Sequence, residues 1–193
     1  QPLLAAAAAH IGHRAIRNHG TVAGSIAHAD PAAELPAVLL ATEGHVIADS
    51  VAGRRSIPAD ELFAGYYQTT LADNELLTWV VVPAIDDGTG WGFCEFAVRS
   101  GDFAQAGAVA LARAMHGTVS SARLVLFAVA DTPVAIDLGA VVGGTPDDAI
   151  AVAGERVDAW VAEHAVDTTR STLIGEVARR ALTDALRRTR LTP

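Results

Sequence analysis

IGHRAIRNHGTVAGSIAHADP, residues 11–31, is the most informative stretch of the chain. It combines glycines, small hydroxyl residues, arginines and histidines within a short segment. Glycine permits positive φ and lets a ligand lie close to the backbone, and successive backbone N–H groups in a tight turn form a concave anion site. We therefore predict a turn over Thr21–Ser25 that binds a phosphate-bearing cofactor. An ordinary glycine turn without a ligand is the alternative.

The composition excludes several classes of protein. A chain of 193 residues with 51% hydrophobic residues suits one compact unit or two small ones. Its formal net charge of −8 argues against a nucleic-acid or membrane-surface partner. No apolar run reaches the length of about 20 residues that spans a membrane. The single Cys94 can form neither an intramolecular disulfide nor an iron–sulfur site, so a reducing, cytoplasmic setting is predicted.

Residues 1–87 are predicted to form short elements separated by turns. Alanine favours helix near the N-terminus, Pro36 is tolerated in the first turn of a helix, and a glycine between β-rich segments indicates a hairpin. The expected elements are a helix over 3–11, an extended segment over 16–18, a helix over 34–42, a hairpin of 45–49 with 54–57, a helical turn over 58–63 and a strand over 76–82.

Residues 88–193 are predicted to form a second unit after the polar segment 84–90. Strands are expected over 91–98, 106–115 and 122–129, where small and branched residues alternate. Thr145 has the features of a helix N-cap, with a proline and acidic residues after it, and the last helix is expected to begin at Asp167 or Thr168. Strands followed by helices indicate an α+β domain, a three-stranded antiparallel sheet with helices on one face.

The stretch from Ile11 to Val38 resembles the second flavin motif of the medium, FAD-binding subunit of molybdenum hydroxylases, a family that includes aerobic carbon monoxide dehydrogenase and xanthine dehydrogenase. The likeness continues through Ala72–Leu77 and Arg99–Ala104 to the C-terminal helix. It implies the second subdomain of a two-part FAD-binding (PCMH-type) fold, followed by the C-terminal domain of a medium subunit.

The resemblance also implies a function and partners. In that family FAD receives electrons from iron–sulfur clusters and passes them to an external acceptor. The implied heteromer contains a large subunit with the molybdenum cofactor, which oxidises the substrate, and a small subunit with [2Fe–2S] clusters. Flavin accepts electrons singly and releases them as a pair. No residue of this chain is therefore expected to act as an acid, base or nucleophile.

Ten residues are predicted to contact FAD through this resemblance. The backbone and hydroxyls around Thr21 and Ser25 match the family's flavin contacts, although Ala23 stands where the family has glycine. Acidic side chains suit sugar hydroxyls but also cap helices, and apolar positions that match a flavin wall also suit a core. The predicted set is Ile11, Thr21, Val22, Ala23, Gly24, Ser25, His28, Asp30, Glu34 and Leu77.

Other constellations give weaker predictions. Glu95 stands near a position where family members often carry lysine, which puts a cationic flavin contact in doubt. Arg99 and Asp102 are interpreted as an ion pair or a turn-fixing pair. The spacing His10-x-x-His13 does not predict a metal site without converging carboxylate or cysteine partners. A triad of Ser25, His28 and Asp30 is not predicted, because neighbours in one loop rarely converge.

The alternative to a flavoprotein is a non-catalytic scaffold or interaction module that keeps the fold without flavin. The family also binds FAD through a Gly-rich loop in an N-terminal subdomain, and no such loop precedes Ile11. We therefore expect this chain alone to bind FAD weakly or not at all and to be inactive in isolation. An unrelated phosphate-binding domain is a third possibility, but it leaves the matches at Leu77 and Arg99–Asp102 unexplained.

Overall fold

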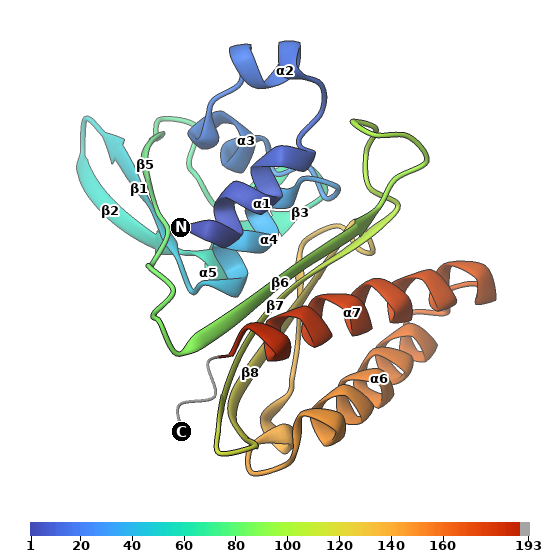
Figure 1. The fold of residues 1–193 in the computed structure, drawn as a ribbon. Helices are drawn as coiled ribbons and strands as arrows, with labels where there is room; N and C mark the ends of the chain where they lie inside the picture. The colour runs from blue at the N-terminus through green and yellow to red at the C-terminus, as the bar shows by residue number, and fades with distance from the viewer. Residues whose placement is uncertain (190–193) are drawn as a thin grey trace.

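The centre of the protein, described here from a computed structural model over residues 1–189, is an antiparallel sheet with the strand order β6-β7-β8-β9. Two long helices, α6 and α7, cover one face, and α1 and α4 pack on the other (Figure 1). The bounds are β6 Thr89–Phe96, β7 Ala106–Met115, β8 Thr118–Phe127, β9 Val134–Ile136, α6 Pro146–Glu163, α7 Thr168–Arg188, α1 Pro2–His10 and α4 Glu34–Ala41.

The alternation along β7 explains why both faces of this sheet are covered. Ala108, Ala110 and Ala112 point into the core beneath α6 and α7, whereas Val109 points into the core beneath α1 and α4. Small side chains on the first face let α7 approach closely. The approach is closest at β6, where a Cβ on Gly92 would overlap with the backbone carbonyl oxygen of Ala181 on α7.

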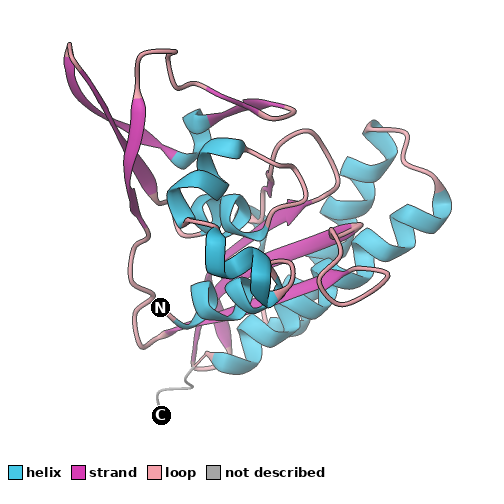
Figure 2. Cartoon of the chain, turned by 90° about the horizontal axis from the view of Figure 1, so that it is seen from above, coloured by secondary structure: helices cyan, strands magenta, loops and turns pink. Residues whose placement is uncertain are grey.

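The first part of the chain forms smaller elements around a three-stranded sheet of order β2-β1-β5. Its β1–β2 hairpin projects from the body of the molecule (Figure 2). Short helices and a two-stranded ribbon, β3 with β4, complete this part. The bounds are α2 Arg14–His19, α3 Val22–His28, β1 His45–Ser50, β2 Gly53–Pro58, α5 Ala59–Leu62, β3 Phe63–Gly65, β4 Gln68–Thr69 and β5 Leu76–Val81. The 3₁₀ turn η1 Gly139–Val141 lies later in the chain, between β9 and α6.

Most predicted elements are confirmed, including the α+β class. The helix starts are confirmed in detail: Thr145 and Asp148 form a reciprocal capping box on α6, and the Asp167 side chain accepts from the amides of Thr169 and Arg170. The predicted boundary at residue 87 lies in a loop but stays a prediction, since one hydrophobic core extends from α1 and α4 to the central sheet. The predicted second unit, 88–193, ends with four residues outside the described part.

Three predictions were wrong. Residues 16–18 are helical within α2 rather than extended. Thr21–Ser25 is the start of helix α3 rather than a glycine turn, because Thr21 Oγ1 accepts a hydrogen bond from the Gly24 amide at 2.9 Å and caps the helix. The central sheet has four strands rather than three, because the short β9 pairs with β8. The sequence pattern of β9 did not indicate a strand.

Candidate functional site

A groove of about 810 Å³ runs between α1, α2, α3 and the start of α4. Its wall is mainly apolar. Leu4 on α1 and Ile11 just after it line the groove together with Ile16, Val22 and Leu35. Ile16 and Val22 are 60% and 46% exposed, which is unusual for branched apolar side chains gathered in one place. The volume is within the range of small-molecule and cofactor sites.

The rim of the groove is polar and carries hydrogen-bond donors. Thr21 and Ser25 line it at the beginning of α3, where the first amides of a helix lack intrahelical acceptors. The Arg17 guanidinium also lines it and is fixed by hydrogen bonds from Nη1 to the carbonyls of Ile11 and Gly12, at 2.8 and 2.7 Å. His19 and His28 complete the rim. This arrangement suits an anionic group at the end of an apolar ligand.

Gly24 and Ala23 have roles that the sequence pattern did not predict. A Cβ on Gly24 would lie 2.8 Å from Thr21 Oγ1, so the glycine protects the cap of α3 rather than supplying a positive φ. Ala23 lies inside α3 and is not among the residues with positive φ. Alanine at a glycine position of the family motif therefore causes no backbone strain here.

The structure brings six of the ten predicted residues to the groove. These are Ile11, Thr21, Val22, Gly24, Ser25 and His28. Ala23 packs against the neighbouring core.

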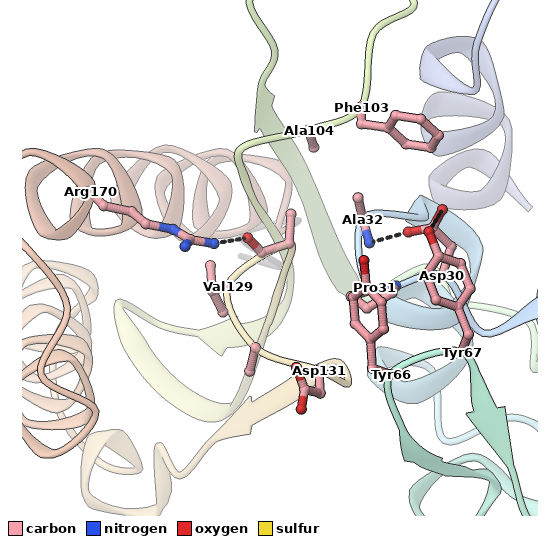
Figure 3. Close-up of a pocket in the computed structure, with 12 residues that line it drawn as sticks. Asp30, Pro31, Ala32, Tyr66, Tyr67, Phe103, Ala104, Val129, Asp131 and Arg170 are labelled. Atoms are coloured by element: carbon pink, nitrogen blue, oxygen red, sulfur yellow. Dashed lines mark hydrogen bonds between the residues drawn. The ribbon is translucent and has the colours of Figure 1, made fainter.

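Asp30, Glu34 and Leu77 lie elsewhere. Asp30 accepts hydrogen bonds from the Ala32 amide at 2.9 Å and the Tyr67 hydroxyl at 3.2 Å, and it lines a second cavity (Figure 3). Glu34 is buried in the first turn of α4, and Leu77 is buried in the core. For these three residues a contact with the cofactor stays a prediction.

Glu34 is buried and lies within electrostatic influence of Glu95 and Asp30. Burial raises the pKa of Glu34 to about 7, and the charges of Glu95 and Asp30 add to the effect. Burial also raises the pKa of Glu95, although His10 Nδ1 lies 3.0 Å from its Oε1 and acts in the opposite direction. Within residues 1–189, Glu95 Oε2 is buried without a hydrogen-bond partner. Residue 95 therefore offers a hydrogen-bond acceptor where family members often carry a cationic side chain nearby.

The described chain also gives the geometry of other constellations that the sequence analysis considered. Residues 1–189 contain no group of histidine, cysteine and acidic side chains that could hold a metal ion. Arg99 and Asp102 form a turn, in which the Asp102 amide donates to the Arg99 carbonyl at 3.1 Å, and no ion pair joins their side chains within residues 1–189. No helix in this part of the chain is long and apolar enough to cross a membrane.

Several groove residues were missed by the sequence analysis. Leu4, Ile16, Arg17 and His19 line the groove but were treated as ordinary helix or loop residues. The positions of Leu4, Ala8 and Ile11 follow helical spacing and could have indicated a second apolar face on α1. Arg17 gave a weaker signal, because it lies in the segment 16–18 that was predicted to be extended.

The groove, with its apolar wall and polar rim, has the form of a cofactor site. Comparisons with known proteins identify the family and its cofactor. Residues 1–85 match the family model described as "FAD binding domain in molybdopterin dehydrogenase". The nicotine 6-hydroxylase medium subunit of Paenarthrobacter nicotinovorans is 38% identical over 97% of this chain and 68% of its own length. The carbon monoxide dehydrogenase medium chain of Hydrogenophaga pseudoflava is 42% identical over 68% of this chain and 46% of its own length.

The solved structures agree. One of carbon monoxide dehydrogenase from Hydrogenophaga pseudoflava matches with a TM-score of 0.88 and 34% identity, over 97% of this chain and 68% of that chain. Quinoline 2-oxidoreductase from Pseudomonas putida 86 matches with a TM-score of 0.83 and 30% identity, over 96% of this chain and 67% of that chain. The chain belongs to the FAD-binding medium subunits of the molybdenum hydroxylases. It is thus a component of oxidoreductases, and its cofactor is FAD.

Proposed function

We propose that the groove between α1, α2 and α3 binds FAD and that the chain serves as the flavin-carrying part of a medium subunit. One observation carries the proposal: an apolar wall of Leu4, Ile11 and Val22 ends at a rim with Thr21 and Arg17. The wall suits a flat ring system, and the rim suits a pyrophosphate. FAD, when bound, accepts electrons singly and releases them as a pair.

The chain's own residues would bind and orient the cofactor. The amides at the start of α3 that have no partner within the helix would donate to the pyrophosphate, while the Gly24 amide is bonded to Thr21 Oγ1, which caps the helix. Arg17 adds a positive charge that hydrogen bonds to Ile11 and Gly12 already orient. Leu4 and Ile11 exclude water from one side of the bound molecule. Binding, orientation and exclusion of water are the roles that this arrangement offers.

The partners and the electron path are part of the same proposal. The relatives are named as medium subunits or chains, which implies large and small subunits around them. We propose that this chain assembles with a large subunit holding the molybdenum cofactor and a small subunit holding [2Fe–2S] clusters. Electrons from those clusters would leave through FAD to an external acceptor. A cytoplasmic location stays a prediction from the single cysteine.

The alternative is a scaffold that keeps the fold without flavin. Glu95, an acceptor where the family often has a cation, favours it. Ala23, which stands where the family has glycine, does not favour it, because this residue is in a helix without positive φ.

Replacing Arg17 by alanine is expected to weaken FAD binding about tenfold, the loss that accompanies a charge-assisted hydrogen bond. Because the chain alone is expected to bind FAD weakly or not at all, the dissociation constant is measured in the complex with its partner subunits, freed of flavin and titrated with FAD while flavin fluorescence is followed. Arg14→Ala is the matched control, because Arg14 lies on the same helix but does not line the groove. Equal dissociation constants for the two variants would contradict the proposed site.

Co-purification from the native host tests the assembly. Absorbance and metal analysis should find flavin, iron and molybdenum together in the complex that contains this chain. A complex with iron and molybdenum but without flavin would support the scaffold instead.

A further inference from the structure

Two hydrogen bonds in series connect the C-terminal helix α7 to the loop between α3 and α4. The Arg170 guanidinium, in the first turn of α7, donates from Nη2 to the Ala128 carbonyl at 2.7 Å (Figure 3). The Ala128 amide in turn donates to the Pro31 carbonyl at 2.8 Å. Ala128, directly after β8, therefore uses both of its backbone groups to join segments that lie far apart in the sequence.

The conformation of Ala128 indicates that this connection is maintained against a local cost. Ala128 has φ of 59°, in the left-handed region that is unfavourable for alanine. A residue persists in such a conformation where its surroundings determine it. Here the surroundings are the two hydrogen bonds and the burial of the residue, which is 8% exposed.

The loop that accepts the second hydrogen bond connects two helices of the proposed FAD groove. His28, the last residue of α3, and Leu35, near the start of α4, both line the groove. Between them, the Ala33 amide donates to the Asp30 carbonyl at 3.0 Å, and the Ala32 amide donates to Asp30 Oδ1 at 2.9 Å. The loop is internally hydrogen-bonded, so a shift of the loop is transmitted to the helix ends on either side.

Arg170 acts from outside the groove. The residues that line the groove lie between Gln1 and Leu35, and Arg170 is not among them. Within residues 1–189 its guanidinium forms no ion pair. The side chain that caps α7 is that of Asp167. The guanidinium is thus used for its part-buried contact with the Ala128 carbonyl.

We propose that Arg170 is a positioning residue for the FAD groove, acting through Ala128 and Pro31 on the loop between α3 and α4. This inference rests on the proposed function of the groove. The affinity for FAD then depends on α7, although the groove itself is formed by α1 to α4. Without the Arg170 contact the loop and both helix ends can move, and the groove spends less time in the geometry that FAD needs, which weakens the apparent affinity.

Titration with FAD of the complex with its partner subunits, freed of flavin, tests this role. Arg170→Met, which keeps the length of the side chain without a donor, is expected to raise the dissociation constant about tenfold, as for the loss of a charge-assisted hydrogen bond. Arg170→Lys keeps a charged donor and should restore most of the affinity. Arg179→Ala is the matched control and should bind FAD normally, because Arg179 lies on the same helix but pairs with Glu176.

Hydrogen–deuterium exchange of the flavin-free chain distinguishes positioning from a general loss of stability. In Arg170→Met the amides of Ala32 and Ala33 should exchange about tenfold faster than in the wild type, whereas the amides of β7 should keep their rate. Equal acceleration in β7 would show that Arg170 only stabilises the fold, and the proposal would be overturned. An Arg170→Lys variant that binds FAD no better than Arg170→Met would also contradict it.

The positioning role and the groove itself fail in different ways. If Arg17→Ala raises the dissociation constant of FAD and Arg170→Met does not, the positioning role is wrong and the groove stands. If neither variant changes the dissociation constant, the groove is not the FAD site, and the role of Arg170 is overturned with it.

Discussion

Replacing Gly92 by alanine should lower the free energy of unfolding by about 3 kcal/mol, the upper part of the usual range for overpacking. A Cβ at this position would overlap with the backbone carbonyl of Ala181 on α7. The same helix also crosses Gly90, where a Cβ would overlap with the carbonyl of Ala185, so α7 cannot shift along β6 to make room. The backbone must move apart, and the core beneath α7 loses contact.

Urea unfolding followed by circular dichroism measures this effect. Gly175→Ala is the matched control, since it makes the same chemical change on α7 at a position with nothing within 4 Å of the added Cβ. Alanine within a helix should raise stability there by about 0.5–1 kcal/mol. If Gly92→Ala and Gly175→Ala shift the urea midpoint alike, the close packing of α7 on β6 does not contribute measurably to the free energy of unfolding.

Glu34→Gln should remove most of a pH dependence that the wild-type chain shows between pH 5 and pH 8. The pKa of Glu34 is raised from 4.5 to about 7 by burial in the folded state. Its stabilising contribution is therefore fully present below pH 4.5 and is lost as the pH rises through 7. Between pH 5 and pH 8 this loss amounts to about 2–3 kcal/mol.

Urea titrations at pH 5 and pH 8, without added FAD, measure the difference for each variant. Glu61→Gln, on the exposed side of α5, is the control for the loss of a carboxylate. The wild type and Glu61→Gln should lose stability towards pH 8, whereas Glu34→Gln should change much less. An unaltered pH dependence in Glu34→Gln would show that Glu34 is not buried as described.

The sequence was a good guide to elements whose signal is local. Thr145 with Asp148, and Asp167 before the last helix, use short-range capping that can be recognised in the residues themselves. The segment 16–18 was mistaken because α2 is short and none of its residues is buried, so it lacks the apolar periodicity that indicates a helix. The strand β9 is only three residues long, and its pairing with β8 depends on tertiary contact.

The candidate site was predictable only in part. Thr21 and Ser25 belong to a recognisable motif, and they do line the groove. Asp30 and Glu34 do not line the groove, because Asp30 is hydrogen-bonded to Tyr67 and Glu34 is buried in the first turn of α4. Leu4 contributes to the groove through space from another helix, which spacing along the chain cannot reveal.

Strands β7 and β8 lie between the two hydrophobic cores and contribute side chains to both. Leu124 and Leu126 belong to one core, whereas Val125 and Phe127 belong to the other. Neither core can be exposed to solvent without losing a face of the same two strands. The backbone amides of β7 and β8 should therefore exchange with deuterium only through global unfolding, and the two halves should melt in a single cooperative transition.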